Sequence, residues 1–260
     1  MSTKIILKAN KVHHSVGPCY LVDMQLPFAS IHPEVESPQG IATSSSTSWL
    51  LTLSPSKIIG IGVNYRAHAV EMGKGLPAEP LMFFKPSTAL LSPNGNIIRP
   101  QGYARVDYEG ELGVVIGRRA SKIRREDALS YVAGYTCVND VSVRELQTKD
   151  GQWARAKGFD SFCPVGPRVV AGLAPTDLRI QTRVNGETRQ NSTTADMLFD
   201  VATLIWFASH HMTLLPGDLI STGTPAGVGN LSVGDIVEVE IEGIGILRNT
   251  VVEGAPPLAL

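Results

Sequence analysis

The stretch VDYEGELGVVIG, residues 106–117, holds the densest set of residues able to do chemistry. Read as a strand, it places Asp107, Glu109 and Glu111 on one face, because side chains alternate along a strand. The residues that follow, 112–116, are apolar on both faces, which is typical of a strand without a solvent side. Buried carboxylates without partners are costly. The pattern therefore calls for arginine partners, shared protons or a divalent cation.

A divalent cation suits a close carboxylate pair, because its charge turns their repulsion into joint coordination. Asp140, in GYTCVNDVS, ends another strand-like run and is the candidate third ligand beside Glu109 and Glu111. Oxygen ligands without clustered histidine or cysteine favour Mg²⁺, with Mn²⁺ or Ca²⁺ as alternatives, over Zn²⁺. Spacing alone leaves this metal site and a solvated acidic patch equally open.

A second acidic strand shows why the spacing is not decisive. In VEVEIEG, Glu238, Glu240 and Glu242 alternate with valine and isoleucine. This clean alternation indicates a strand with one face in water. We expect no function of these glutamates.

His68 and Glu71, in NYRAHAVEM, are neighbours if the segment is a helix, since residues three apart share a face. A carboxylate beside an imidazole orients the ring and stabilises its protonated form, as a general base for water requires. On the residues alone, an exposed helical ion pair of little consequence explains the spacing better.

The elements that must position these residues are mostly short strands punctuated by Gly, Pro, Asn and Asp. Asn185-Gly186 predicts a type I′ hairpin turn, and Asp200 is a candidate N-cap for a helix in VATLIWFASHH. Shorter helical pieces are expected over 125–131 and 143–147. This pattern predicts a mainly β fold with a few short helices, a sandwich or roll. Residues 57–260 form the predicted catalytic domain, and residues 1–56 form an N-terminal region of uncertain role.

The composition and net charge of the chain limit the kinds of partner that we expect. The chain has 260 residues, a formal net charge of −1 and no basic patch, so we expect no nucleic-acid partner. No apolar run approaches the ~20 residues of a membrane span, and no secretory signal is evident. Three well-separated cysteines without C-x-x-C suit a reducing compartment, which predicts a cytoplasmic protein with buried thiols.

Over roughly residues 55–252 the sequence resembles the fumarylacetoacetate hydrolase family. The resemblance rests on several segments that occur in order: IIGIGVNYRAHAVEMG, MFFKPSTAL, VDYEGELGVVIG, GYTCVNDVSVRELQ, WARAKGFDSFCPVGP, VNGETRQ and LLPGDLISTGTPAGVG. It implies a mixed β-sandwich roll of this family's type, a homodimer, and a divalent metal held by Glu109, Glu111 and Asp140.

The resemblance also implies site roles. His68 and Glu71 would form a catalytic dyad on a lid, with glycines 73 and 75 as a hinge, and Lys157 would contact a substrate oxygen. Further candidates for substrate binding are Lys85, Arg144, Gln147, Gly223 and Thr224. Without the resemblance, a surface charge or a plain glycine-rich turn would explain most of them.

Together these residues predict a Mg²⁺-dependent enzyme for small 2-oxo acids, working through an enolate that the metal would stabilise. Hydrolysis of a C–C bond in an acylpyruvate or decarboxylation of oxaloacetate is the leading expectation. One alternative is an isomerase or decarboxylase of 2-hydroxyhepta-2,4-diene-1,7-dioate-type substrates in aromatic catabolism. Another is a non-catalytic, metal-stabilised binding protein.

Overall fold

The structure is a computed structural model that describes residues 10–12, 19–21 and 55–256. The chain divides into two units, Met1–His32 and Pro33–Leu260. In the first unit, β1 (Asn10–Val12) pairs antiparallel with β2 (Cys19–Leu21). The predicted boundary between residues 56 and 57 stays a prediction, because the segment before it lies largely outside the described residues.

A seven-stranded mixed sheet forms the centre of the second unit. Its spatial order is β4 (Leu81–Lys85), β3 (Ile58–Gly62), β14 (Leu219–Ser221), β8 (Gly110–Ile116), β9 (Val132–Asn139), β11 (Cys163–Val170) and β5 (Leu90–Leu91). Strand β8 lies between two neighbours and is buried at every position, as its apolar run predicts. The carboxylates at its start are therefore held inside the protein.

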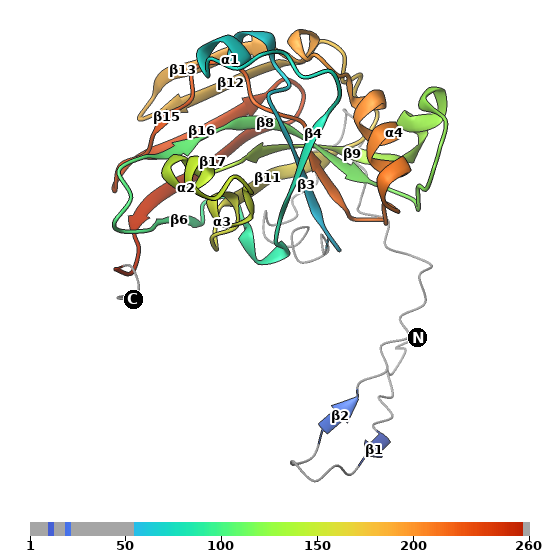
Figure 1. The fold of residues 1–260 in the computed structure, drawn as a ribbon, viewed down its shortest axis with the longest axis horizontal. Helices are drawn as coiled ribbons and strands as arrows, with labels where there is room; N and C mark the ends of the chain where they lie inside the picture. The colour runs from blue at the N-terminus through green and yellow to red at the C-terminus, as the bar shows by residue number, and fades with distance from the viewer. Residues whose placement is uncertain (1–9, 13–18, 22–54, 257–260) are drawn as a thin grey trace, which may run out of the picture. The chain divides into compact units, whose positions relative to one another are not determined.

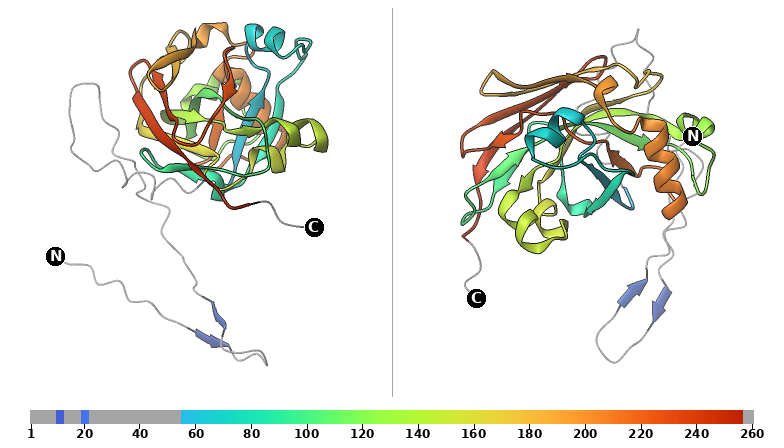
Figure 2. Two further views of the ribbon diagram at one scale, coloured as in Figure 1. Left: turned by 90° about the vertical axis from the view of Figure 1, so that its left-hand side faces the viewer. Right: turned by 45° about the horizontal axis from the view of Figure 1, so that its top comes forward.

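A five-stranded sheet packs against one face of the first. Its order is β13 (Glu187–Thr193), β12 (Arg179–Val184), β16 (Ile236–Ile241), β17 (Gly245–Glu253) and β6 (Asn96–Arg99). The main core lies between the two sheets, and both curl around it (Figures 1 and 2). It includes Leu112 and Val114 from β8 and Val239 and Ile241 from β16. Burying these apolar faces is the main force holding the sheets together.

Strand β16 confirms the predicted alternation of VEVEIEG. Val237, Val239 and Ile241 are buried, while the intervening glutamates are partly exposed. Arg183 forms ion pairs with Glu238 and Glu240 at 3.2 and 2.7 Å. The glutamate face of β16 is therefore partly in contact with solvent, whereas β8 is buried on both faces.

A three-stranded sheet, in the order β10 (Ser142–Val143), β7 (Val106–Tyr108) and β15 (Gly229–Asn230), adjoins the large sheet. The chain passes from β7 in this sheet to β8 in the large sheet through a single residue, Glu109. The Glu109 N–H donates to Asn139 Oδ1 at 3.0 Å, and its carbonyl accepts from the Asp140 N–H at 2.8 Å. The junction therefore fixes the backbone of two candidate metal ligands.

Helices are short and few, as predicted. They are α1 (Arg66–Glu71), η1 (Ser87–Ala89), η2 (Arg125–Tyr131), α2 (Arg144–Asp150), α3 (Ala154–Lys157), η3 (Thr194–Asp196) and α4 (Val201–His211). Asp200 caps α4 through a bond from the Thr203 N–H at 2.8 Å, which confirms the predicted start. Asn185 and Gly186 both have positive φ between β12 and β13, as a type I′ turn requires. The mainly β fold class is confirmed.

None of the helices within the described residues combines the length and the apolar character needed to cross a bilayer.

Candidate active site

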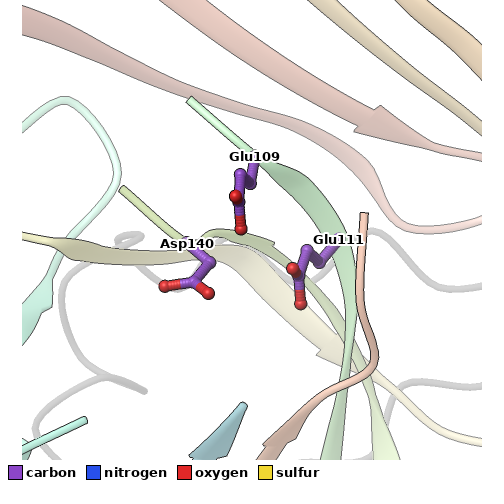
Figure 3. Close-up of side chains that lie close together, drawn as sticks. All are labelled: Glu109, Glu111 and Asp140. Carbon is purple, nitrogen blue, oxygen red and sulfur yellow. The ribbon is translucent and has the colours of Figure 1, made fainter. Parts of the chain in front are cut away.

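Three carboxylates converge at the start of β8 and the end of β9. Gly110 pairs with Asn139 in the antiparallel register of β8 and β9. Glu109, which precedes Gly110, and Asp140, which follows Asn139, are therefore the next residues at the same end of this strand pair. Glu111 lies two residues after Glu109 and shares its face. One carboxylate oxygen from each of the three lies within 4.8 Å of the others, and all three side chains are buried (Figure 3). The sequence-predicted ligand set therefore meets in space.

Three cations form ion pairs with Glu109 and Asp140, two members of this cluster. Lys157 Nζ lies 2.7 Å from Glu109 Oε2 and 2.6 Å from Asp140 Oδ2. Lys85 Nζ, fully buried, lies 2.5 Å from the other Asp140 oxygen. Arg144 Nη2 lies 2.7 Å from Glu109 Oε1, as an ion pair and not as a well-aligned hydrogen bond. Lysines this deeply buried are rare unless paired, so the two lysines belong to the site and not to the surface.

The two glutamates have opposite electrostatic surroundings. Burial alone would raise the pKa of Glu109, but Lys157 and Arg144 outweigh it and hold that pKa below its usual range. Burial, followed by the negative charges of Asp140 and Glu109, raises the pKa of Glu111 well above its ordinary value. Glu111 is thus the carboxylate whose charge is least compensated by the protein.

Glu111 is fixed by two hydrogen bonds to one oxygen, from the Ser221 hydroxyl at 2.5 Å and the Gly223 N–H at 2.8 Å. Gly223 has φ +97°, and a Cβ there would lie 2.7 Å from Asn64 Cβ. This position therefore requires glycine. Gly223, predicted as a substrate-binding residue, orients a candidate metal ligand in the structure; a substrate contact stays a prediction.

Arg144 is held in place by a buried aspartate. Asp107 is 0% exposed, and its Oδ2 accepts from Arg144 Nε at 2.7 Å. Arg144 Nη1 donates to Gln147 Oε1 at 2.9 Å, one turn along α2. Arg144 and Gln147 are thus brought together beside Glu109, as the sequence predicts. The structure shows Asp107 to be a buried partner of Arg144 and not a surface acid.

The His68–Glu71 pair lies on α1. His68 Nδ1 is 2.9 Å from Glu71 Oε2, and the imidazole is largely buried. Glu71 Oε1 accepts from the Gly227 N–H at 2.9 Å. The charge of His68 also contributes to the low pKa of Glu109. The dyad is therefore formed in the structure and lies within electrostatic reach of the acidic cluster.

Thr224 forms two hydrogen bonds within the protein. Its hydroxyl donates to the Gly110 carbonyl at 2.9 Å and accepts from Gln190 Nε2 at 2.8 Å. Both hydrogen-bonding roles of the hydroxyl are used, which stabilises the glycine-rich loop against β8. A substrate contact by Thr224 stays a prediction.

The donor set fits a hard divalent cation. Three buried carboxylates within coordinating distance of one another, with an undercompensated Glu111 among them, match the oxygen ligands that Mg²⁺, Mn²⁺ or Ca²⁺ prefer. Glu109, Glu111 and Asp140 would hold the ion, with Ser221 and Gly223 orienting Glu111. Such supporting hydrogen bonds are typical of metal sites.

Sequence reasoning did not identify Ser221 or Asn139 as parts of this region. Ser221 lies in LISTG and Asn139 directly precedes Asp140, so both are neighbours of residues that the sequence did single out.

Comparison with known proteins identifies the class that this fold and site define. Residues 57–252 match the model of the fumarylacetoacetate (FAA) hydrolase C-terminal family. The chain therefore belongs to the fumarylacetoacetate hydrolase family, as the resemblance of its motifs predicted.

Three relatives illustrate its range. The chain is 44% identical over 209 residues to 2,4-didehydro-3-deoxy-L-rhamnonate hydrolase of Sphingomonas sp., covering 76% of this chain and 73% of the relative. It is 42% identical over 231 residues to the mitochondrial oxaloacetate tautomerase of Xenopus laevis, covering 84% and 72%. The crystal structure of 2-hydroxyhepta-2,4-diene-1,7-dioate isomerase from Mycobacterium marinum matches with a TM-score of 0.71 at 47% identity, covering 76% and 75%.

Proposed function

We propose that this protein is a divalent-metal-dependent enzyme that hydrolyses or decarboxylates a small 2-oxo acid. The observation that carries the proposal is the buried cluster of Glu109, Glu111 and Asp140 beside an assembled His68–Glu71 dyad. A structural metal alone would not need a histidine–carboxylate pair within its electrostatic reach. We further propose that it acts in the cytoplasm, as a homodimer.

A bound Mg²⁺ or Mn²⁺ would act as a Lewis acid toward the oxygens of the 2-oxo acid and stabilise the negative charge that develops in the reaction. The residues around it would orient the substrate. Lys157 and Lys85 supply buried positive charge on the side of Asp140, and Arg144, held by Asp107 and Gln147, supplies a planar donor group. Such fixed charges are effective because they need no reorganisation as the reaction proceeds.

The dyad supplies the proton transfer. Glu71 accepts the hydrogen bond at His68 Nδ1, which keeps the proton there and leaves Nε2 free as a base. Nε2 would remove a proton from water that attacks the distal carbonyl group, or move a proton along the substrate carbon chain. General bases of this kind typically contribute about 10²–10⁴-fold to the rate.

A second candidate is isomerisation of a dienedioate, and it is supported by the similarity to the Mycobacterium marinum isomerase. The same proton transfer by His68 would shift a double bond without cleaving the chain. The tautomerisation of oxaloacetate, for which the Xenopus laevis relative is named, is a still smaller step of the same kind.

The test is turnover by the full chain with Mg²⁺ or Mn²⁺. Consumption of acetylpyruvate, oxaloacetate and 2-hydroxyhepta-2,4-diene-1,7-dioate is followed by ultraviolet absorbance and product analysis. Blanks contain the same metal without protein, because metal ions alone promote loss of oxaloacetate. Cleavage that disappears with EDTA supports the proposal, whereas double-bond migration alone supports the second candidate.

Glu109→Gln is the matched site variant and Glu242→Gln, on the exposed face after β16, its control. Loss of turnover in Glu109→Gln only, in protein that is still folded at the assay temperature, indicates a catalytic metal. No turnover of any substrate by the parent protein, combined with a metal-dependent melting temperature, would replace the proposal with a metal-stabilised binding protein.

A further inference from the structure

The backbone of Lys74 is fixed to the dyad helix. The Gly73 N–H donates to the Val70 carbonyl at 3.0 Å, and the Lys74 N–H donates to the Ala69 carbonyl at 2.9 Å. With Gly73 at φ +62°, this pair of bonds is the Schellman motif that ends a helix. Gly73 therefore caps α1, and Lys74 keeps a defined position relative to His68 and Glu71.

The side chain of Lys74 has a defined resting place. Its ammonium lies 5.1 Å from the ring centre of Trp153, within the range of a cation–π contact. Trp153 packs edge-to-face on Phe83, with centroids 5.2 Å apart, and Lys157 Nζ lies 4.9 Å from the centre of the Phe83 ring. Two lysines thus stand at opposite ends of one aromatic pair.

The glycines of IIGIGVNY make room for this pair. A Cβ at Gly60 would overlap the Phe83 ring, and one at Gly62 would lie 2.7 Å from the Trp153 indole. The two glycines share a face of β3, because they are two residues apart. The two glycines let an apolar wall lie directly on the sheet, between Lys74 and Lys157.

The charge of Lys74 is not balanced. Lys85, Lys157 and Arg144 each form an ion pair with a carboxylate of the site. Lys74 has no ion pair among the residues that the structure describes. Lys74 is an exposed residue, but partial desolvation of its ammonium and the positive charge of Arg144, opposed by Glu109 and reinforced by Lys157, lower its pKa. A negative group bound beside Lys74 would relieve this repulsion.

We infer that Lys74 binds a second anionic group of the substrate, a carboxylate at the end remote from the 2-oxo acid. This inference rests on the proposed function. The 2-oxo acid end lies at the acidic cluster with Lys157, the carbon chain follows the Phe83–Trp153 wall, and the far carboxylate meets Lys74 at the end of the dyad helix. Lys74 would therefore favour substrates with a remote carboxylate over acylpyruvates with an apolar tail.

The test compares two acylpyruvates that differ by one carboxylate, 2,4-dioxoheptanedioate and 2,4-dioxoheptanoate. Wild type is expected to prefer the diacid. Lys74→Met should lower kcat/KM for the diacid about 10–100-fold, mainly through KM, because one charge-assisted hydrogen bond is lost. The monoacid should be unaffected, and Lys74→Arg should recover most of the diacid activity. Lys149→Met, an exposed lysine on α2, is the matched control.

Inhibition by oxalate, which lacks a remote carboxylate, should be the same in Lys74→Met as in wild type. Equal losses for both substrates, or no preference for the diacid in wild type, would overturn the role of Lys74. Calorimetric binding of both acids in the presence of Mg²⁺ separates the two proposals. If neither acid is turned over but the diacid binds more weakly to Lys74→Met than to wild type, the proposed reaction is refuted and the proposed binding site is supported. Equal binding of the diacid to Lys74→Met and to wild type refutes the binding site.

Discussion

Glu71 and Gly227 join the dyad helix to the glycine-rich loop through one hydrogen bond, from the Gly227 N–H to Glu71 Oε1 at 2.9 Å. The other carboxylate oxygen faces His68 Nδ1. Gly227 has φ +101°, and a Cβ there would overlap the Arg189 carbonyl, so only glycine brings this N–H to Glu71. One carboxylate thus both fixes the helix and orients the imidazole.

Replacing Glu71 by glutamine separates these two tasks. The amide oxygen of Glu71→Gln can still accept from the Gly227 N–H, but its NH₂ group donates to His68 Nδ1. The ring proton must then move to Nε2, which can no longer act as a base. We expect kcat to fall about 10²–10⁴-fold with little change in melting temperature. Steady-state kinetics and thermal unfolding measure both.

Glu71→Ala is the companion variant, since it removes both hydrogen bonds. It should lose activity to a similar extent and also loosen α1, which hydrogen exchange of residues 66–74 would report. An active Glu71→Gln enzyme would show that His68 is not the base.

Sequence reasoning reached the acidic cluster because its residues lie in regular strands or directly beside them. Alternation put Glu109 and Glu111 on one face, and the apolar run after them indicated burial. The antiparallel register that brings Asp140 beside Glu109 is a long-range property. The strand-like run that ends at Asp140 made it the candidate third ligand, and the family resemblance then supported that choice.

The features of the site that the sequence did not predict depend on contacts between segments far apart in the chain, which no local sequence pattern encodes. Asp107 shares the alternation of its neighbours, yet its burial follows from β7 lying between β10 and β15 in a separate sheet. The contact of Lys74 with Trp153 joins residues 79 positions apart along the chain, through a side chain that could have pointed to water. The hydrogen bonds of Thr224 could not be foreseen either, because its partners Gly110 and Gln190 lie 114 and 34 positions away along the chain.

Asp107 is predicted to position Arg144. Asp107→Ala removes one partner of a buried ion pair and should cost about 3–5 kcal/mol of unfolding free energy. Asp107→Asn keeps an acceptor oxygen, so it should cost less while raising KM for the 2-oxo acid more than it lowers kcat. Urea unfolding and steady-state kinetics test this. The exposed ion-pair variant Glu126→Gln should cost less than about 1 kcal/mol. An unchanged KM in Asp107→Asn would refute the positioning role.

Lys157 and a divalent cation should compensate for each other in stability. Lys157→Met leaves Glu109 and Asp140 without a shared cation, which should destabilise the metal-free protein by about 3–5 kcal/mol. Added Mg²⁺ supplies positive charge to the same carboxylates, so it should raise the melting temperature of Lys157→Met more than that of wild type. Thermal unfolding with EDTA or Mg²⁺ measures this. The metal site is refuted if Mg²⁺ stabilises neither protein.

The buried thiols predict how stability changes at alkaline pH. Burial raises the pKa of both Cys137 and Cys163 to about 12. In the unfolded chain these thiols lose protons near their ordinary pKa, while the folded protein retains them. Their contribution to stability is therefore complete below about pH 9 and is lost as pH rises from 9 toward 12, by about 1.4 kcal/mol per pH unit for each thiol.

Cys137→Ala tests this by difference, because tyrosines and lysines titrate in the same range. Urea unfolding at pH 8, 9.5 and 10.5 should show a constant offset from the lost packing, plus a slope about 1.4 kcal/mol per pH unit shallower than wild type above pH 9. Cys163→Ala should behave alike. In the Cys19→Ser variant, Cys137 and Cys163 are the remaining cysteines. When folded, this variant should also react slowly with a thiol reagent at pH 8, since a buried thiol is not ionised at that pH. Parallel pH profiles for Cys137→Ala and wild type would show that the Cys137 thiol ionises equally well in the folded protein.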